Sequence, residues 1–220
     1  MATKYSPKIV TNGMVLYLDA SNTRSYPGSG TTWNDLSGNG NNGTLTNGPT
    51  FSTANMGSIV FDGTNDYVIA SNSLLSHGTS DWTYSTWLKF NGTPSLGTIF
   101  ENGYWNNSLL VRFETSVITI YSMSTYWGNF TLSPTLGLWY KLDFFRNGNT
   151  LYFYLNGKLS QSISFTADIQ PTSNILIGSS QHAANQCFNG NISQFLIYNR
   201  ALSATEVLQN YNATKSRFGL

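Results

Sequence analysis

Two stretches of the chain decide its fold: FDGTNDYV at residues 61–68 and GNISQFLIYNRALS at residues 190–203. The first joins apolar residues to a run of Asp, Gly, Thr and Asn, which is the composition of a tight turn between strands. The second is a longer apolar run, which predicts a buried strand. SATE at residues 203–206 then forms a capping box, in which a serine and a glutamate each satisfy a backbone N–H at a helix start. The two stretches therefore predict strands, followed by one short helix.

Strand signals of the same kind recur between Met14 and Tyr198. The apolar side chains of residues 109–113 fall on one face, and residues 117–121 are a natural partner strand. Asn-Gly pairs at 147–148 and 156–157 predict type I′ hairpin turns, so three strands should meander through residues 140–165. The helix that starts at Ser203 is expected to end near Asn212. The pattern predicts an all-β sandwich or barrel over residues 14–212, with an N-terminal arm at 1–13 and a C-terminal tail at 213–220.

The composition limits the possible partners. The chain has 220 residues, of which 15% are aromatic and only 10% are charged. A chain of this length buries about 70% of its unfolded surface, so its core needs no disulfide or metal. The net charge of +1 and the isoelectric point near 7.8 leave no basic surface for nucleic acid or an anionic membrane. We therefore expect an uncharged surface of Asn, Ser, Thr and Gly.

The chain also lacks several signals that would fix its location. Cys187 is the only cysteine, so no disulfide forms within the chain. Residues 1–8 lack the apolar run of a secretory signal, and no stretch approaches the roughly 20 apolar residues that span a bilayer. We expect a soluble protein with no membrane insertion and no classical signal peptide. If it works outside a cell, assembly on a virus particle or release by lysis would place it there.

Five segments, taken in order, carry a family resemblance. They are MVLYLD with WNDLSGNGNNGTL (14–19 and 33–45), FDGTNDYV (61–68), WTYSTWL (82–88), WYKL with LYFYLNG (139–142 and 151–157), and ISQFLIYNRALSATEVLQ (192–209). Together they resemble a laminin-G-like or pentraxin-type domain of the concanavalin A-like lectin/glucanase superfamily. The resemblance implies a jelly-roll sandwich of two antiparallel sheets with one short C-terminal helix, a fold that binds sugars and surfaces more often than it catalyses. Similar domains occur among structural and decoration proteins of tailed phages.

Calcium is the first candidate ligand. Many members of this family hold Ca²⁺ with loops that correspond to residues 35–42 and 62–66 here. Ca²⁺ takes six to eight oxygen ligands, and carboxylates and amides supply them. The candidate ligands are Asp35, Asn39, Asn41, Asp62, Asn65 and Asp66. The alternative is plain turn chemistry, because Asp, Asn and Gly also favour β-turns without any metal.

A glycan is the second candidate ligand. Two aromatic and amide clusters lie in sequences that resemble loops between strands: Tyr104, Trp105 and Asn106, and Tyr126, Trp127 and Asn129. Exposed aromatic faces pack on the C–H faces of sugars, and amides bond to their hydroxyls. The alternative is that these aromatic side chains fold back and cover the edge of the sandwich.

Glycoside hydrolysis is a remote third possibility. Glycosidases need two carboxylates about 5–10 Å apart on one face. The chain has only Glu101, Glu114 and Glu206 as glutamates, and the capping box uses Glu206. Neither of the others has an acidic partner at strand-neighbour spacing, although the two could meet across strands. We therefore predict no enzymatic activity.

The sequence thus predicts a non-catalytic module that binds carbohydrate or a surface, with a glycan or host-surface polysaccharide as partner. The missing signal peptide and the extracellular type of fold lead us to expect a virion decoration or fibre protein that contacts other virion proteins. Because repetition offsets the weakness of a single site, we expect display in many copies, and a homo-oligomer is compatible with this. The alternative is a purely structural cement or spike protein of a capsid or tail, without glycan binding.

Overall fold

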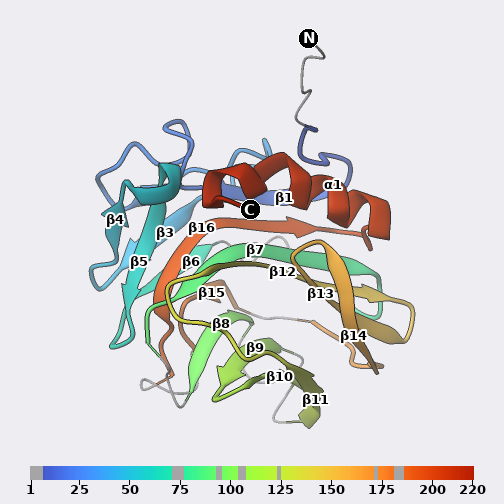
Figure 1. Cartoon of the computed structure of the whole chain (residues 1–220). Helices are drawn as coiled ribbons and strands as arrows, with labels where there is room; N and C mark the ends of the chain where they lie inside the picture. Colours follow the sequence, from blue (N-terminus) through green and yellow to red (C-terminus); the bar gives the residue numbers. More distant parts are fainter. Residues whose placement is uncertain are drawn as a thin grey trace.

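The computed structural model shows two antiparallel sheets packed face to face, with a helix across one outer surface (Figure 1). The structure describes residues 7–70, 77–92, 96–103, 108–122, 125–170, 173–180 and 186–220. This architecture confirms the predicted sandwich of two sheets with one C-terminal helix.

Each sheet has eight strands. The first, sheet A, has the order β14-β13-β12-β7-β16-β5-β4, and β1 also pairs with β16. Its strands are β1 (Met14–Asp19), β4 (Thr50–Ser52), β5 (Ser58–Asp62), β7 (Trp82–Phe90), β12 (Trp139–Asn147), β13 (Thr150–Leu155), β14 (Lys158–Ser164) and β16 (Asn189–Tyr198). The predicted meander is confirmed as β12, β13 and β14, which pair in sequence.

The second sheet, sheet B, has the order β11-β10-β9-β8-β15-β6-β3-β2. Its strands are β2 (Thr32–Trp33), β3 (Gly43–Thr46), β6 (Tyr67–Ala70), β8 (Gly97–Asn102), β9 (Leu109–Glu114), β10 (Val117–Ser122), β11 (Thr125–Thr131) and β15 (Ile175–Ile177). The expected partnership of residues 109–113 with 117–121 is confirmed, because β9 and β10 form a hairpin.

Aromatic side chains fill the space between the sheets. Tyr84 of β7 stacks on Phe100 of β8 with ring centroids 4.6 Å apart, so the two sheets meet there directly. Phe144 of β12 packs against Phe153 and lies 6.3 Å from Phe130 of the opposite sheet. Each of these rings is buried, and such offset and edge contacts add to the stabilisation from burial alone.

The helix α1 (Ala204–Thr214) covers part of the outer face of sheet A, above β16 and β1 (Figure 1). Its capping box forms as predicted: the Ser203 side chain accepts from the Glu206 backbone, and the Glu206 side chain accepts from the Ser203 backbone. The helix continues two residues past its predicted end and runs into a 3-10 helix, η3 (Lys215–Phe218). Residues 213–220, expected to be a tail, therefore begin as helix.

These last residues pack on the sheet. The Phe218 ring stacks on Trp87 of β7 at 4.3 Å and lies 4.6 Å from Trp139 of β12. The Trp87 ring N–H also donates to the Thr214 hydroxyl at 2.7 Å. The C-terminal segment is thus part of the sandwich domain, because it shields two tryptophans on the outer face of sheet A from water.

Residues 7–13 of the predicted arm also contact the domain. The backbone N–H of Val10 donates to the Asn210 side chain at 2.8 Å, and its carbonyl accepts from the Tyr198 hydroxyl at 2.9 Å. Val10 itself is buried among Leu196, Tyr198 and Val207.

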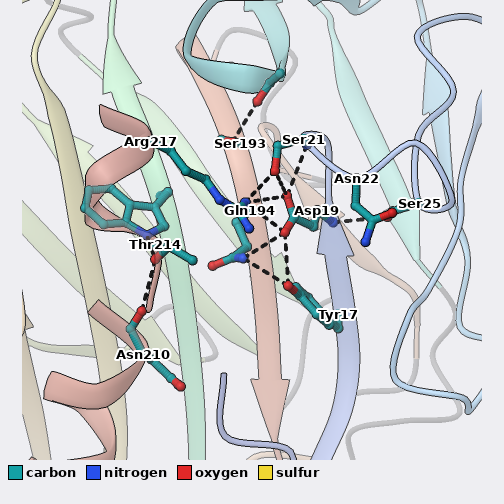
Figure 2. A network of polar contacts seen from close by, with 12 residues as sticks. Tyr17, Asp19, Ser21, Asn22, Ser25, Ser193, Gln194, Asn210, Thr214 and Arg217 are labelled. Carbon is teal, nitrogen blue, oxygen red and sulfur yellow. Dashed lines mark hydrogen bonds and ion pairs between the residues drawn. The ribbon is translucent and has the colours of Figure 1, made fainter. Parts of the chain in front are cut away.

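A buried polar network links the two ends of the chain (Figure 2). Arg217 of η3 donates to both carboxylate oxygens of Asp19 in β1, at 2.9 and 3.0 Å, and also contacts Ser21. Asp19 is only 1% exposed and also accepts from Tyr17 and Gln194. Because the carboxylate has this many donors, its charge is compensated inside the fold.

Candidate functional site

A groove of about 490 Å³ opens on the outer face of sheet B. The lining residues that the structure describes share one property: none carries a charge. They are Asn47, Asn65, Tyr67, Ile69, Ser173, Asn174, Leu176, Ser179, Ser180 and Cys187. The volume lies within the roughly 300–1,000 Å³ of typical ligand pockets.

The floor of the groove comes from two paired strands. Ile69 of β6 lies opposite Leu176 of β15. Because Val68 and Ile175 point into the core, the alternation of a strand turns Ile69 and Leu176 outward. Tyr67 is two residues before Ile69 and therefore faces the same way. The floor is thus aliphatic, with one tyrosine beside it.

Amides and hydroxyls form the rims. The Asn47 side chain donates to the backbone carbonyl of Asn65 at 3.0 Å, which ties the turn after β3 to the turn before β6. Asn47 adopts a left-handed conformation with φ of 67°, which asparagine tolerates better than most residues. Ser173 and Asn174 precede β15, and Ser179, Ser180 and Cys187 line the rest of the groove. Such a lining supplies hydrogen bonds to a polar ligand and an apolar surface to its C–H groups.

The predicted aromatic platform is only partly described, because Tyr104, Trp105 and Asn106 lie outside the described residues. Tyr126, Trp127 and Asn129 were expected in a loop, and this was wrong: they belong to the edge strand β11. Tyr126 is 54% exposed, and Asn129 is exposed too. Trp127 is half-buried, packs on Phe165 at 5.1 Å and directs its ring N–H inward. Trp127 therefore matches the alternative of an aromatic that folds back on the sandwich.

Tyr126 lies in a small cluster with three residues of the same sheet. Its ring is 5.9 Å from Tyr121 of β10, and the Arg112 guanidinium lies 4.8 Å from the Tyr121 ring. Arg112 in turn pairs with Glu114 and donates to Gln186 at 2.8 Å. In the strand register, Leu110 and Glu101 lie between Tyr121 and Leu176 of the groove floor, and both are buried. Tyr121 and Tyr126 are therefore separate from the groove floor.

The predicted calcium residues near β1 have another role in the structure. The Asp35 carboxylate accepts from four donors: the backbone N–H groups of Tyr17, Ser37 and Asn41 and the Ser37 hydroxyl. The Asn39 and Asn41 side chains donate to the Val15 carbonyl. This segment thus covers the free edge of β1 with side-chain hydrogen bonds, as exposed sheet edges require.

The other predicted calcium residues form the turn between β5 and β6. Asp66 accepts from the Asp62 backbone at 3.0 Å, and Asp62 accepts from the Thr64 backbone at 2.7 Å. Burial raises the pKa of the Asp66 carboxyl, and the neighbouring Asp62 charge raises it as well. Asn65 instead lines the groove. Among the described residues, no group of three or more His, Cys, Asp or Glu side chains could hold a metal ion. Calcium at this turn stays a prediction.

The glutamates are far apart for glycoside hydrolysis. Glu101 of β8 lies opposite Leu110 of β9, and Glu114 lies four residues farther along β9. At about 3.3 Å per residue the two positions are about 13 Å apart, beyond the spacing of both glycosidase classes. Glu114 pairs with Arg112, and Glu206 pairs with Arg200 at 2.6 Å as well as capping α1. The hydrogen bonds from Arg200 outweigh the effect of burial at Glu206, so the pKa of Glu206 falls to about 2.

Two further polar clusters are buried. Lys141 and Asp143 lie 3.3 Å apart with Ser85 between them, and both side chains are inaccessible. His77 lies 3.1 Å from the Tyr84 hydroxyl, which also accepts from Asn102. Each cluster is closed to an outside ligand, whereas the groove is open to one.

Double-sheet jelly rolls occur in lectin domains, in viral capsid proteins and in cupins. The comparison with family models makes the assignment specific. Residues 62–208 match the model of the concanavalin A-like lectin/glucanases superfamily, and the chain belongs to this family. The predicted family resemblance is therefore confirmed. No curated protein sequence matches the chain.

Solved structures share the fold at low identity. The binding domain of Paraclostridial Mosquitocidal Protein 1 is 18% identical with a TM-score of 0.73, covering 92% of this chain and 52% of that chain. The receptor binding domain of botulinum neurotoxin D is 16% identical with a TM-score of 0.72, covering 91% and 52%. A Trypanosoma rangeli sialidase in complex with sialic acid is 13% identical with a TM-score of 0.73, covering 97% and 36%. The chain thus spans about half of each toxin domain and about a third of the sialidase.

Sequence reasoning missed most of the groove. Asn65 was considered only as a metal ligand, and Tyr67, Asn47 and Asn174 were not considered at all. One usable signal was present: the alternation of YVIA at 67–70 places Tyr67 and Ile69 on the same face. The sequence pattern that indicates this site is an outward-facing tyrosine, Tyr67, next to turns that contain Asn47 and Asn65.

Proposed function

We propose that the protein is a non-catalytic carbohydrate-binding module whose ligand occupies the groove on sheet B. One observation carries this proposal: an uncharged lining of asparagines and serines surrounds an aliphatic floor and Tyr67. Sugars present C–H faces to apolar surface and a dense set of hydroxyls to amides and serines, so the groove complements both.

The arrangement of the acids supports binding without turnover. No acidic side chain is among the described residues that line the groove, and Glu101 and Glu114 have the wrong spacing for a hydrolytic pair. The family contains lectins and glucanases, so the fold alone does not decide between them. Two of the similar structures are a binding domain of a mosquitocidal protein and a receptor binding domain of a botulinum neurotoxin, which agrees with a binding role.

Replacing Tyr67 by Ala tests the proposal. We expect the variant to lose binding on a glycan array and in calorimetry, because Tyr67 is the one aromatic side chain among the described lining residues. Tyr126→Ala is the matched control, since it removes an exposed tyrosine at the far edge of the same sheet. Both variants should keep the melting temperature within a few degrees. Loss of binding in Tyr126→Ala with full binding in Tyr67→Ala would move the site to β11.

The display of this module in many copies on a virion, with contacts to other virion proteins, is a further proposal. It is supported by the resemblance to phage structural domains and by the weakness of single glycan sites, which repetition offsets. No helix in the described parts of the chain has the length and apolar character to cross a membrane. Mass photometry of the purified chain and labelling of intact particles test the copy number and the location.

A further inference from the structure

We propose that the groove selects uncharged sugars and rejects glycans that present a carboxylate to it, such as those ending in sialic or glucuronic acid. This inference rests on the proposed carbohydrate function and adds the ligand class. It follows from the charges in and around the groove.

The lining that the structure describes offers no cation. Its polar groups are the amides of Asn47, Asn65 and Asn174, the hydroxyls of Tyr67 and three serines, and the Cys187 thiol. Amides and hydroxyls match sugar hydroxyls, which are neutral donors and acceptors. A carboxylate bound in this groove would give up much of its hydration without a charged partner, which is unfavourable.

One end of the groove is close to negative charge. Asn65 and Tyr67 flank Asp66, whose side chain bonds back to the Asp62 backbone in the turn between β5 and β6. No arginine or lysine bond to either carboxylate is present in the described structure. The turn therefore adds repulsion to an anionic ligand and leaves a neutral ligand unaffected.

The cation on the strands of sheet B already has partners. Arg112 is the only Lys or Arg residue within the strands of sheet B. It lies on β9, two strands from β15, and it bonds to Glu114 and Gln186. Arg112 lies opposite Thr98, which bridges to the lining residue Cys187, so one strand position separates Arg112 from that end of the groove. The Arg112 guanidinium is held there by Glu114. Arg112 therefore cannot serve a carboxylate in the groove without breaking its own ion pair.

The experiment compares matched oligosaccharides that share one core and differ only in a terminal sialic or glucuronic acid. We expect the neutral member of each pair to bind and the acidic member to bind at least about tenfold more weakly at low salt, where charge effects are largest. Asn174→Arg places a cation on the rim of the groove and should narrow or reverse this preference. Ser160→Arg, on an exposed position of β14 in the other sheet, adds the same charge away from the groove and should leave the preference unchanged.

The outcomes separate the two proposals. Equal or tighter binding of the acidic glycans to the unmodified protein would overturn the charge selection and leave the carbohydrate function standing. An absence of binding to every glycan, in a protein with an unchanged melting temperature, would overturn both. An equal shift of preference in Asn174→Arg and Ser160→Arg would show that net charge acts at long range and that the groove does not select.

Discussion

At the scale of single residues, His77 makes the fold sensitive to acid. The imidazole is 6% exposed, and Nε2 lies 3.1 Å from the Tyr84 hydroxyl. Burial lowers the pKa of His77 to about 3, and the nearby Arg146 charge contributes to the same shift. In the unfolded chain, His77 has an ordinary pKa near 6.5 and is protonated below that pH, whereas in the folded protein it stays neutral until the pH approaches about 3.

The stability that His77 contributes is therefore complete above about pH 6.5 and is lost as the pH falls toward 3. One proton gained on unfolding predicts a slope approaching about 1.4 kcal/mol per pH unit below pH 6.5. Denaturant unfolding between pH 6.5 and 4.5 measures this slope before most carboxylates titrate. His77→Gln should flatten the slope in this range, and His182→Gln is the matched control for the other histidine. An identical slope in wild type and His77→Gln would refute the assignment.

Single residues also show why a short polar motif fits either a metal site or a hydrogen-bonded turn. The segment around Asp35 has the composition of a cation loop, yet its oxygens accept hydrogen bonds from β1 and from the segment's own backbone. The donor on β1, the Tyr17 backbone, is distant in the sequence, so local spacing cannot reveal it. Asp and Asn occur both in turns and in calcium sites because both need several side-chain oxygen atoms close together.

At the scale of elements, an ion pair and an aromatic stack help to hold the C-terminal segment α1–η3 on sheet A. Arg217 bonds to the buried Asp19, and Phe218 stacks on Trp87 and contacts Trp139. Arg217→Ala leaves the Asp19 charge buried with only neutral donors. We expect a loss of about 2–4 kcal/mol in the free energy of unfolding, because breaking a buried pair on one side is strongly unfavourable.

A double-mutant cycle with Asp19→Asn measures the coupling, since a neutral amide at this position needs no cation and should restore part of the stability. Arg24→Ala removes an exposed arginine in the nearby loop and is the matched control, with an expected change within about 0.5 kcal/mol. Additive effects of Asp19→Asn and Arg217→Ala would show that the pair does not hold the segment.

At the scale of the whole molecule, strand alternation predicted the architecture and the hairpins well. The β12–β13–β14 meander follows from two Asn-Gly turns and from side chains that alternate between the faces. Residues 126–129 were mistaken for a loop because their pattern is irregular. The register of β11 shifts where Tyr121 pairs with Tyr126, and Gly128 has φ of 151°. A bulge of this kind turns a neighbouring side chain to the other face, so Trp127 points inward.

The groove was harder to predict because its residues come from four separate parts of the chain. They meet only because β15 inserts between β6 and β8, which brings residues 173–180 beside residues 65–69. A single sequence gives the strands but not their order in the sheet. The residues of the capping box, by contrast, are local in sequence, and they were predicted correctly.

The two outer faces of the sandwich differ, and this difference leads to the last prediction. Sheet A carries α1 and η3 on its outer face, whereas sheet B presents the groove. Hydrogen exchange with and without a saturating neutral oligosaccharide should therefore show added protection in residues 43–48, 65–70 and 173–180. Residues 204–218 should exchange at the same rate in both states, because they cover the opposite sheet. A bound ligand slows exchange where it restricts local opening. Protection in α1, with none in β6 or β15, would therefore place the ligand on sheet A and contradict the proposed site.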